Sequence, residues 1–167
     1  MLFTLIGMPG SGKSCMGKAV SGKVKLKNID SDLLIQKNMG KKLYEIIAEI
    51  GTDAFKELEE RTLTEFSEDN CILSTGGSAV YYDNAMKHLK QLGKVVYLKV
   101  DLKTIKERIG DYSKRGIVLK EGQTIDDLYR ERCVLYEKYA DFTINCSGKA
   151  FPRYHAQLID YINSFNK

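Results

Sequence analysis

The sequence contains few of the residues that build metal centres. It has only two histidines, and its four cysteines include no CxxC pair, so we expect no zinc site. The cysteines are expected to be reduced thiols that pack as small apolar side chains. The sequence therefore argues against a zinc-binding protein.

Long apolar segments and linkers are also missing. No apolar run approaches the roughly 20 residues that a membrane span needs, so we expect no membrane partner. The N-terminus has no basic region followed by an apolar run and a cleavage site, and we expect a cytoplasmic protein. Nothing rich in proline, glycine or serine divides the 167 residues. We therefore expect residues 1–167 to form a single domain.

The excess of positive charge is small. The chain has 26 basic and 22 acidic residues, a net charge of +4. We find no basic stripe or exposed aromatic platform of the kind that binds nucleic acid. A mild excess suits a pocket for small anions. We expect a small-molecule substrate, no nucleic-acid partner and a monomer.

Apolar, β-rich runs alternate with helical patterns along the chain. Five runs are expected to be strands: MLFTLI, KNID, CILST, KVVYLKV and DFTIN. Apolar residues at helical spacing predict helices through residues 43–50, 55–66, 105–109 and 125–139 and after Pro152. Strands that alternate with helices pair in parallel. The pattern predicts a three-layer α/β/α fold with a five-stranded parallel sheet.

One segment shows no periodicity. Residues 111–123, DYSKRGIVLKEGQ, are basic and contain glycine. A long irregular connection inside a compact domain is often functional, so we predict a mobile lid here.

The most specific motif is GMPGSGKS, residues 7–14, directly behind the first predicted strand. It fits G-x-x-x-x-G-K-[ST], whose backbone N–H groups surround a phosphate chain at the start of a helix. Lys13 is expected to reach the β- and γ-phosphates, and the Ser14 hydroxyl to ligate magnesium. The motif predicts a nucleoside triphosphate but does not identify the acceptor of its phosphate.

Two carboxylates, Asp30 and Asp32, follow the second predicted strand. Residues i and i+2 of a strand share a face, and ligands bind at the carboxyl ends of parallel strands. No acidic residue follows the third strand, so Asp30 is the candidate that holds the water shell of the metal. The other carboxylate can accept a hydroxyl proton. Either aspartate can instead cap the helix that begins near LLIQ, and that alternative stays open.

Two further features point to the acceptor. In STGGSAV, after the third strand, Gly76 and Gly77 permit a ligand or another backbone to approach. Arg132 lies on the apolar stripe of its predicted helix and should face inward. An inward guanidinium needs an anionic partner. That partner is either an acidic residue of the protein or an anion on a ligand.

Over nearly its whole length the chain resembles the shikimate kinases, a family within the P-loop group of nucleoside-monophosphate-kinase-like proteins. The segments that carry the resemblance are GMPGSGKS, DSDLLIQ, FKELEE, LSTGGSAV, RIGDYSKRG and RERCVLYEKYAD. The resemblance implies a P-loop kinase that uses ATP as co-substrate with Mg²⁺. It implies transfer of the γ-phosphate to the 3-hydroxyl of shikimate, a step of chorismate and aromatic amino-acid biosynthesis.

The resemblance also implies roles for individual residues. ATP would contact Gly10, Ser11, Gly12, Lys13, Ser14, Cys15, Arg108 and Arg115, and the acceptor would contact Asp32, Lys56, Gly76, Gly77 and Arg132. Arg108 would lie against the adenine, Asp32 would act as base and Arg132 would hold the substrate carboxylate. Lys13, Asp32 and Arg115 would be catalytic. A catalytic role for a cation such as Arg115 is also expected independently of the resemblance, because phosphoryl transfer places negative charge on the equatorial oxygens.

Three positions depart from the family pattern. Lys56 stands where arginine is usual, and lysine lacks the planar fork of a guanidinium. Glu59 and Glu60 can orient Lys56, or they can pair with it on a solvated face. Ser78 replaces a glycine and Gly116 replaces a proline. Two alternatives stay open: a related kinase acting on another small hydroxy acid or hydroxyl amino acid, and a nucleotide-binding module without turnover.

Overall fold

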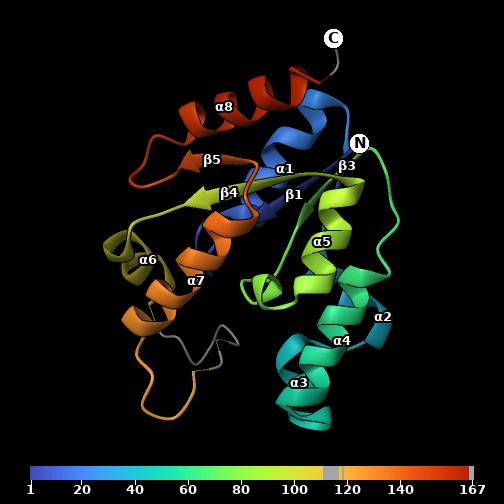
Figure 1. The fold of residues 1–167 in the computed structure, drawn as a ribbon, viewed down its shortest axis with the longest axis vertical. Coiled ribbons are helices and arrows are strands. Elements are labelled where there is room, and N and C mark those ends of the chain that lie inside the picture. Colours follow the sequence, from blue (N-terminus) through green and yellow to red (C-terminus); the bar gives the residue numbers. More distant parts are fainter. Residues whose placement is uncertain (111–116, 118, 166–167) are drawn as a thin grey trace.

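The computed structural model describes residues 1–110, 117 and 119–165. Strands and helices alternate along the chain (Figure 1). Their bounds are β1 Leu2–Ile6, α1 Lys13–Val24, β2 Lys27–Asp30, α2 Ser31–Met39, α3 Leu43–Ile50, α4 Thr52–Thr64, β3 Cys71–Ser74, the 3₁₀-helix η1 Ala79–Tyr81, α5 Asp83–Leu92, β4 Gly93–Lys99, α6 Leu102–Ile109, α7 Ile125–Tyr139, β5 Phe142–Asn145 and α8 Phe151–Asn163. The five predicted strands are confirmed.

All five strands run parallel, in the order β2-β3-β1-β4-β5. The chain leaves the central strand β1 for β2 on one side, returns through β3, and then crosses to β4 on the other side of β1. Where connections diverge in this way, a crevice opens at the carboxyl ends of the strands. The loop of residues 7–14 follows β1 and therefore lies at this switch point.

Helices cover both faces of the sheet. α1 and α8 contact each other on one face, and α5 and α7 lie on the other (Figure 1). On the first face, Phe3 of β1 packs against Tyr161 of α8 and against Phe165, which follows that helix. Strands β1 and β3 are buried along their whole length, as expected of strands that are covered on both sides. The predicted three-layer fold is confirmed.

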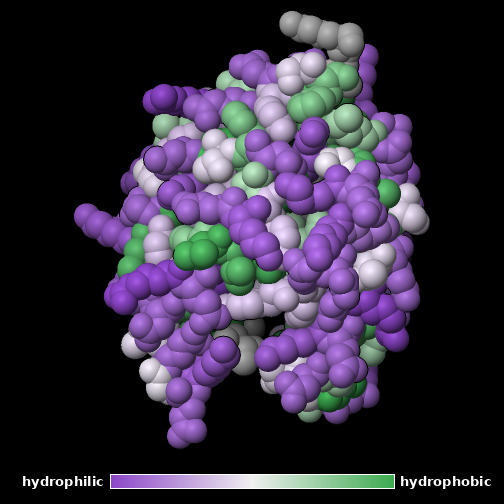
Figure 2. Space-filling model, viewed as in Figure 1, coloured by the Kyte–Doolittle hydropathy of each residue, from purple (hydrophilic) through white to green (hydrophobic). Residues whose placement is uncertain are grey.

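Helices α2, α3 and α4 form a group of their own beside the sheet (Figure 1). α4 packs on α5 and on both α2 and α3. α3 and α4 are separated at Gly51, where the sequence predicts a break. The surface is notched between this group and the part of the molecule around the N-terminal end of α7 (Figure 2).

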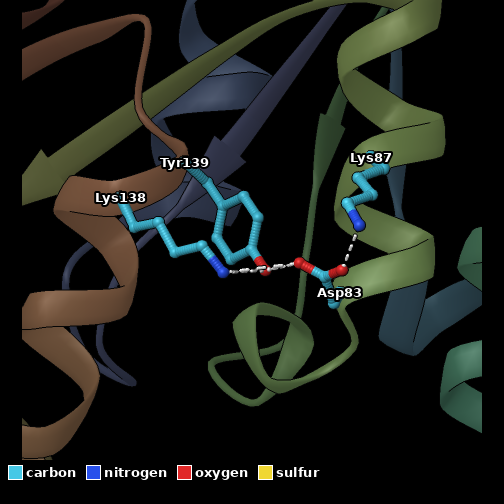
Figure 3. Close-up of polar contacts among 4 residues, drawn as sticks. All are labelled: Asp83, Lys87, Lys138 and Tyr139. Atoms are coloured by element: carbon cyan, nitrogen blue, oxygen red, sulfur yellow. Dashed lines mark hydrogen bonds and ion pairs between the residues drawn. The ribbon is translucent and has the colours of Figure 1, made fainter.

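A polar junction ties α7 to α5 (Figure 3). The Tyr139 hydroxyl donates to Asp83 Oδ1 at 2.5 Å, and the same carboxylate pairs with Lys87 at 2.6 Å and Lys138 at 3.4 Å. The hydrogen bonds from Lys87 and Tyr139 hold the pKa of Asp83 well below its usual range. Because α7 also carries Arg132, the junction fixes the helix from which that arginine projects.

The expectation about the cysteines is wrong at one position. Cys71 and Cys146 are buried, but Cys15 is exposed, because it lies on the outward side of the first turn of α1. Within the described ranges, no three histidine, cysteine or acidic side chains group to hold a metal ion. No helix of that part of the chain is long and apolar enough to cross a membrane.

The predicted lid, residues 111–123, lies mostly outside the described residues. Of its last residues, the N–H of Gln123 donates to the carbonyl of Lys120 at 2.9 Å and closes a turn before α7. Mobility of the lid stays a prediction.

Candidate active site

The phosphate loop joins β1 to α1 at the middle of the sheet. Gly10 and Gly12 have φ angles of 80° and 94°, a region that residues with a Cβ rarely adopt. α1 begins at Lys13 and has no acidic residue in its first turn. The positive end of the helix dipole is therefore left for an anion in the loop.

Lys13 lies inside this loop and is 7% exposed. Its Nζ donates to the carbonyls of Gly7 at 2.7 Å and Met8 at 2.9 Å and to Ser11 Oγ at 3.3 Å. Burial lowers the pKa of Lys13 to about 8, although nearby Asp32 opposes the shift. These acceptors use the three ammonium hydrogens but carry no charge, so a phosphate group is a better partner.

Asp30 both caps a helix and faces the loop. Its Oδ1 accepts from the N–H groups of Asp32 at 3.0 Å and Leu33 at 3.2 Å, which is the capping role that was left open. Its Oδ2 accepts from the Ser14 hydroxyl at 2.5 Å. Magnesium binds through oxygen ligands and keeps several waters. The adjacent oxygens of Ser14 and Asp30 fit such an ion.

Asp32 reaches the site from a helix. β2 ends at Asp30 and α2 begins at Ser31, so the prediction that both aspartates share a strand face is wrong. The reason is the cap, since Asp30 starts the helix as soon as the strand ends. Burial raises the pKa of Asp32 to about 6, with the charges of Glu59 and Asp30 adding to the shift. A carboxylate with a raised pKa is a better proton acceptor.

The turn of Gly76 and Gly77 lies between the predicted acceptor-binding groups. A Cβ on Gly76 would lie 2.4 Å from Glu59 Oε1 and 3.2 Å from Asp32 Oδ1, and one on Gly77 would lie 2.9 Å from Arg132 Nη1. Side chains of the protein therefore occupy the space that the missing Cβ atoms of these glycines leave open. The turn brings Asp32 and Arg132 to one place.

Arg132 is on the inward face of α7, as its place on the apolar stripe predicts, and is 7% exposed. Its Nε donates to the Tyr81 hydroxyl at 3.4 Å, and its guanidinium carbon lies 5.3 Å from the centre of the Tyr81 ring. Among the residues that the structure describes, no carboxylate lies within 4.0 Å of it. No internal ion pair is found there, which favours the other open alternative, an anion on a ligand.

The comparisons with known proteins agree with this geometry. A family model described as shikimate kinase matches residues 9–163. A shikimate kinase of Clostridium botulinum (strain Langeland) is 36% identical, with 98% of this chain and 95% of the relative covered. One of Persephonella marina is 34% identical, with 87% and 89% covered.

This chain belongs to the shikimate kinase family. It is therefore an ATP-dependent kinase, a transferase. A solved structure of the family, the enzyme of Acinetobacter baumannii in complex with shikimate, has a TM-score of 0.88 at 28% identity. The alignment covers 98% of this chain and 93% of that one. The predicted P-loop kinase fold is confirmed.

Lys56, at the first departure from the shikimate kinase pattern, is exposed on α4. In the described part of the chain it forms no ion pair, with Glu59, Glu60 or any other acid. Neither arrangement expected for these glutamates is therefore present. Lys56 is exposed, whereas the cations Lys13 and Arg132 are buried.

Glu59 is a residue of the site that the sequence interpretation missed. Its side chain is 2% exposed. Its oxygens accept from Ser78 Oγ at 2.7 and 2.8 Å and from the Tyr82 hydroxyl at 2.7 Å. Glu59 lies four residues before buried Leu63, on the inward face of α4. That four-residue spacing was the signal in the sequence that Glu59 faces inward. Ser78, at a second departure from the shikimate kinase pattern, is one of the hydrogen-bond partners of Glu59.

Arg108 connects two segments beside the loop. It donates to the carbonyls of Gly10 at 3.4 Å, Cys146 at 3.1 Å and Gly148 at 2.9 Å. Its guanidinium carbon lies 5.6 Å from the centre of the Phe151 ring. These contacts join the phosphate loop to the segment between β5 and α8. A contact between Arg108 and adenine, implied by the shikimate kinase resemblance, stays a prediction.

Arg115 lies outside the described residues, and its role stays a prediction. At the carboxyl edge of the sheet the structure brings together Gly10, Ser11, Gly12, Lys13, Ser14, Asp30, Asp32, Gly76, Gly77 and Arg132.

Proposed function

We propose that this protein transfers the γ-phosphate of ATP to the 3-hydroxyl of shikimate. The observation that carries the proposal is the buried Arg132, which among the described residues has no carboxylate within 4.0 Å, together with Asp32 at the Gly76–Gly77 turn. Shikimate has a carboxylate that can pair with Arg132 and hydroxyls that can donate to Asp32. The matching relatives named shikimate kinase support the same acceptor.

The residues of the site suggest how transfer proceeds. Lys13 and the N-terminal end of α1 hold the phosphate chain, and Ser14 and Asp30 would hold Mg²⁺, Asp30 through water. When bound, the ion would supply positive charge that stabilises the phosphate chain during transfer. Asp32 accepts the proton of the acceptor hydroxyl. The hydroxyl oxygen bonds to the γ-phosphorus as the bond to the bridging oxygen of ADP breaks.

Arg115 is proposed as a second catalytic cation, brought by a lid of residues 111–123. A cation on the equatorial oxygens stabilises the transferring phosphoryl group, and a closed lid excludes water. Replacing Arg115 with alanine should lower kcat by orders of magnitude while ATP still binds. A near-normal rate would show that the role is wrong.

A second candidate is a related kinase that acts on a different small hydroxy acid or hydroxyl amino acid. The observation that favours it is Lys56, which is exposed, whereas Lys13 and Arg132 are buried. Lysine at this position offers no two-point contact with a carboxylate.

A steady-state assay with a panel of acceptors tests both candidates. We expect shikimate to be phosphorylated faster than other hydroxy acids, and Lys13→Ala to abolish turnover. Arg132→Ala should raise KM for shikimate at least tenfold, the loss of one charge-assisted contact, whereas KM for ATP should stay near normal. Lys56→Arg should improve the use of shikimate. Turnover of shikimate no faster than background ATP hydrolysis would remove it as the acceptor.

We further propose that the enzyme acts as a monomer in the cytoplasm, which supplies ATP, with no nucleic-acid or membrane partner. Light scattering at working concentration tests the monomer. A mass of two or more chains would contradict it.

A further inference from the structure

Arg132 is a buried charge with aromatic neighbours. Tyr81, the last residue of η1, lies against it, with its ring centre 5.3 Å from the guanidinium carbon. Cations are attracted to the face of an aromatic ring, more so where water is excluded. Tyr81 is itself 40% exposed, so its ring separates the guanidinium from solvent on that side.

The hydroxyl of Tyr81 has a defined orientation. It donates its proton to Glu131 Oε1 at 2.6 Å, and its oxygen is then free to accept from Arg132 Nε at 3.4 Å. Burial, followed by the hydrogen bond to Glu131, raises the pKa of Tyr81, so the hydroxyl stays protonated. The Glu131 carboxylate thus fixes the direction in which Tyr81 presents its acceptor.

The opposite end of the guanidinium lies at the glycine turn. A Cβ on Gly77 would lie 2.9 Å from Arg132 Nη1. Gly77 is held in place by the Tyr136 hydroxyl, which donates to its carbonyl at 2.7 Å. With Nε directed at Tyr81, and with Tyr136 also near the guanidinium, the terminal N–H groups that do not face Tyr136 are, among the described residues, the donors left for a planar carboxylate.

We propose that Tyr81 is the positioning residue of the acceptor site. Its hydroxyl engages Nε and its ring covers one face of the guanidinium, so that the terminal nitrogens of Arg132 turn toward the carboxylate of the acceptor. The inference rests on the proposed function, because it assigns Tyr81 to the same carboxylate-binding site. Tyr81 acts through Arg132 and need not touch the acceptor.

Two substitutions separate the contributions of the ring and the hydroxyl. Tyr81→Phe keeps the ring and should raise KM for shikimate about 3- to 10-fold, the range for an ordinary hydrogen bond, because the bond to Nε is long at 3.4 Å and acts on the acceptor only through Arg132. Tyr81→Leu removes both and should raise it further. KM for ATP and kcat should stay within about twofold in both variants. The matched control is Tyr161→Phe on α8, on the other face of the sheet, which should leave all three constants unchanged.

A double-mutant cycle with Arg132→Lys tests whether Tyr81 acts through the arginine. Since lysine has no Nε–H to position, Tyr81→Phe should add little to the loss in kcat/KM already caused by Arg132→Lys. Full additivity would overturn the proposal. So would equal changes in KM for shikimate and for ATP, which indicate a general structural effect.

A measurement without substrate distinguishes failure of this inference from failure of the proposed function. In NMR spectra of the unliganded protein, the Arg132 Nε–H should give a signal protected from solvent exchange that Tyr81→Phe removes. If shikimate is not phosphorylated but this signal behaves as expected, the function is wrong and the positioning of Arg132 stands. If the signal is the same in both proteins, the positioning role is wrong whatever the acceptor.

Discussion

At the residue scale, the site holds charges that its own surroundings disfavour. Burial raises the pKa of Asp32 to about 6 and lowers that of Lys13 to about 8. Both shifts favour the neutral form, although phosphoryl transfer needs the charged form of each. Groups with such opposed requirements are typical of functional sites. Two predictions follow from these two side chains.

The first concerns the dependence of kcat/KM on pH. Asp32 must be deprotonated to accept a proton, so activity should fall as pH drops below about 6. Lys13 must be protonated to hold phosphate, so activity should fall again as pH rises above about 8. Because kcat/KM reports the free enzyme, its profile should be bell-shaped between these values. An acid limb near pH 4 would contradict the raised pKa of Asp32.

The second concerns stability. The folded-state pKa of Asp32 lies above its model value of 3.8, so the folded protein loses stability as pH rises through about 6 and the carboxylate ionises. Asp32→Asn removes that loss. It should raise the free energy of unfolding at pH 7 by about 1–3 kcal/mol while lowering turnover, and the gain should vanish near pH 3.

Denaturant unfolding at both pH values measures the effect. Asp160→Asn, at an exposed position of α8, is the control and should change stability little. A variant Asp32→Asn that is less stable than the wild type at pH 7 would show that the buried carboxylate is favourably paired.

At the element scale, Glu59 links α4 to the segment that follows β3. Ser78 lies just before η1 and Tyr82 just before α5, and both donate hydroxyls to this one carboxylate. A buried carboxylate is tolerated only where such donors satisfy it. The three side chains therefore hold the Gly76 turn against the helix group α2–α4.

Tyr82→Phe removes one of these donors without changing the ring. We expect it to lower the free energy of unfolding by about 1.5–3 kcal/mol, the range for hydrogen bonds to charged groups. In a Glu59→Gln background the same substitution should have a smaller effect, because the partner is no longer charged. Tyr44→Phe, at an exposed tyrosine of α3, is the control. Equal losses in both backgrounds would show that the hydroxyl acts on another group.

At the scale of the whole molecule, the fold brings two buried cations from distant parts of the chain to one crevice. Lys13 follows the first strand and Arg132 lies on α7. Burial lowers the pKa of Lys13, and the positive charge of Arg132 adds to this shift while Asp32 opposes it. The unliganded protein is therefore expected to gain stability from multivalent anions.

Tripolyphosphate provides the test. A ligand at 100 times its Kd stabilises the folded state by about 2.7 kcal/mol, so the wild type should show a clear rise in Tm. Lys13→Ala should lose most of this rise, whereas Lys23→Ala, an exposed lysine late in α1, should keep it. The same rise in all three proteins would mean that the anion binds elsewhere.

The sequence by itself determined the local features of this protein. The phosphate loop, the five strands, the break at Gly51 and the inward face of Arg132 follow from patterns within a few residues, because strand and helix periods act over short spans. The family segments supplied the predicted acceptor and the predicted role of Asp32. That aspartate was placed on the wrong element, since one cap decides where β2 ends.

Only the tertiary structure decided which distant side chains meet. Glu59 bonds partners 19 and 23 positions away, and Tyr81 contacts an arginine 51 positions away. No local period links such pairs. They meet because parallel strands place their carboxyl ends at one edge, where a buried polar group must find its partner among whatever residues the fold brings there.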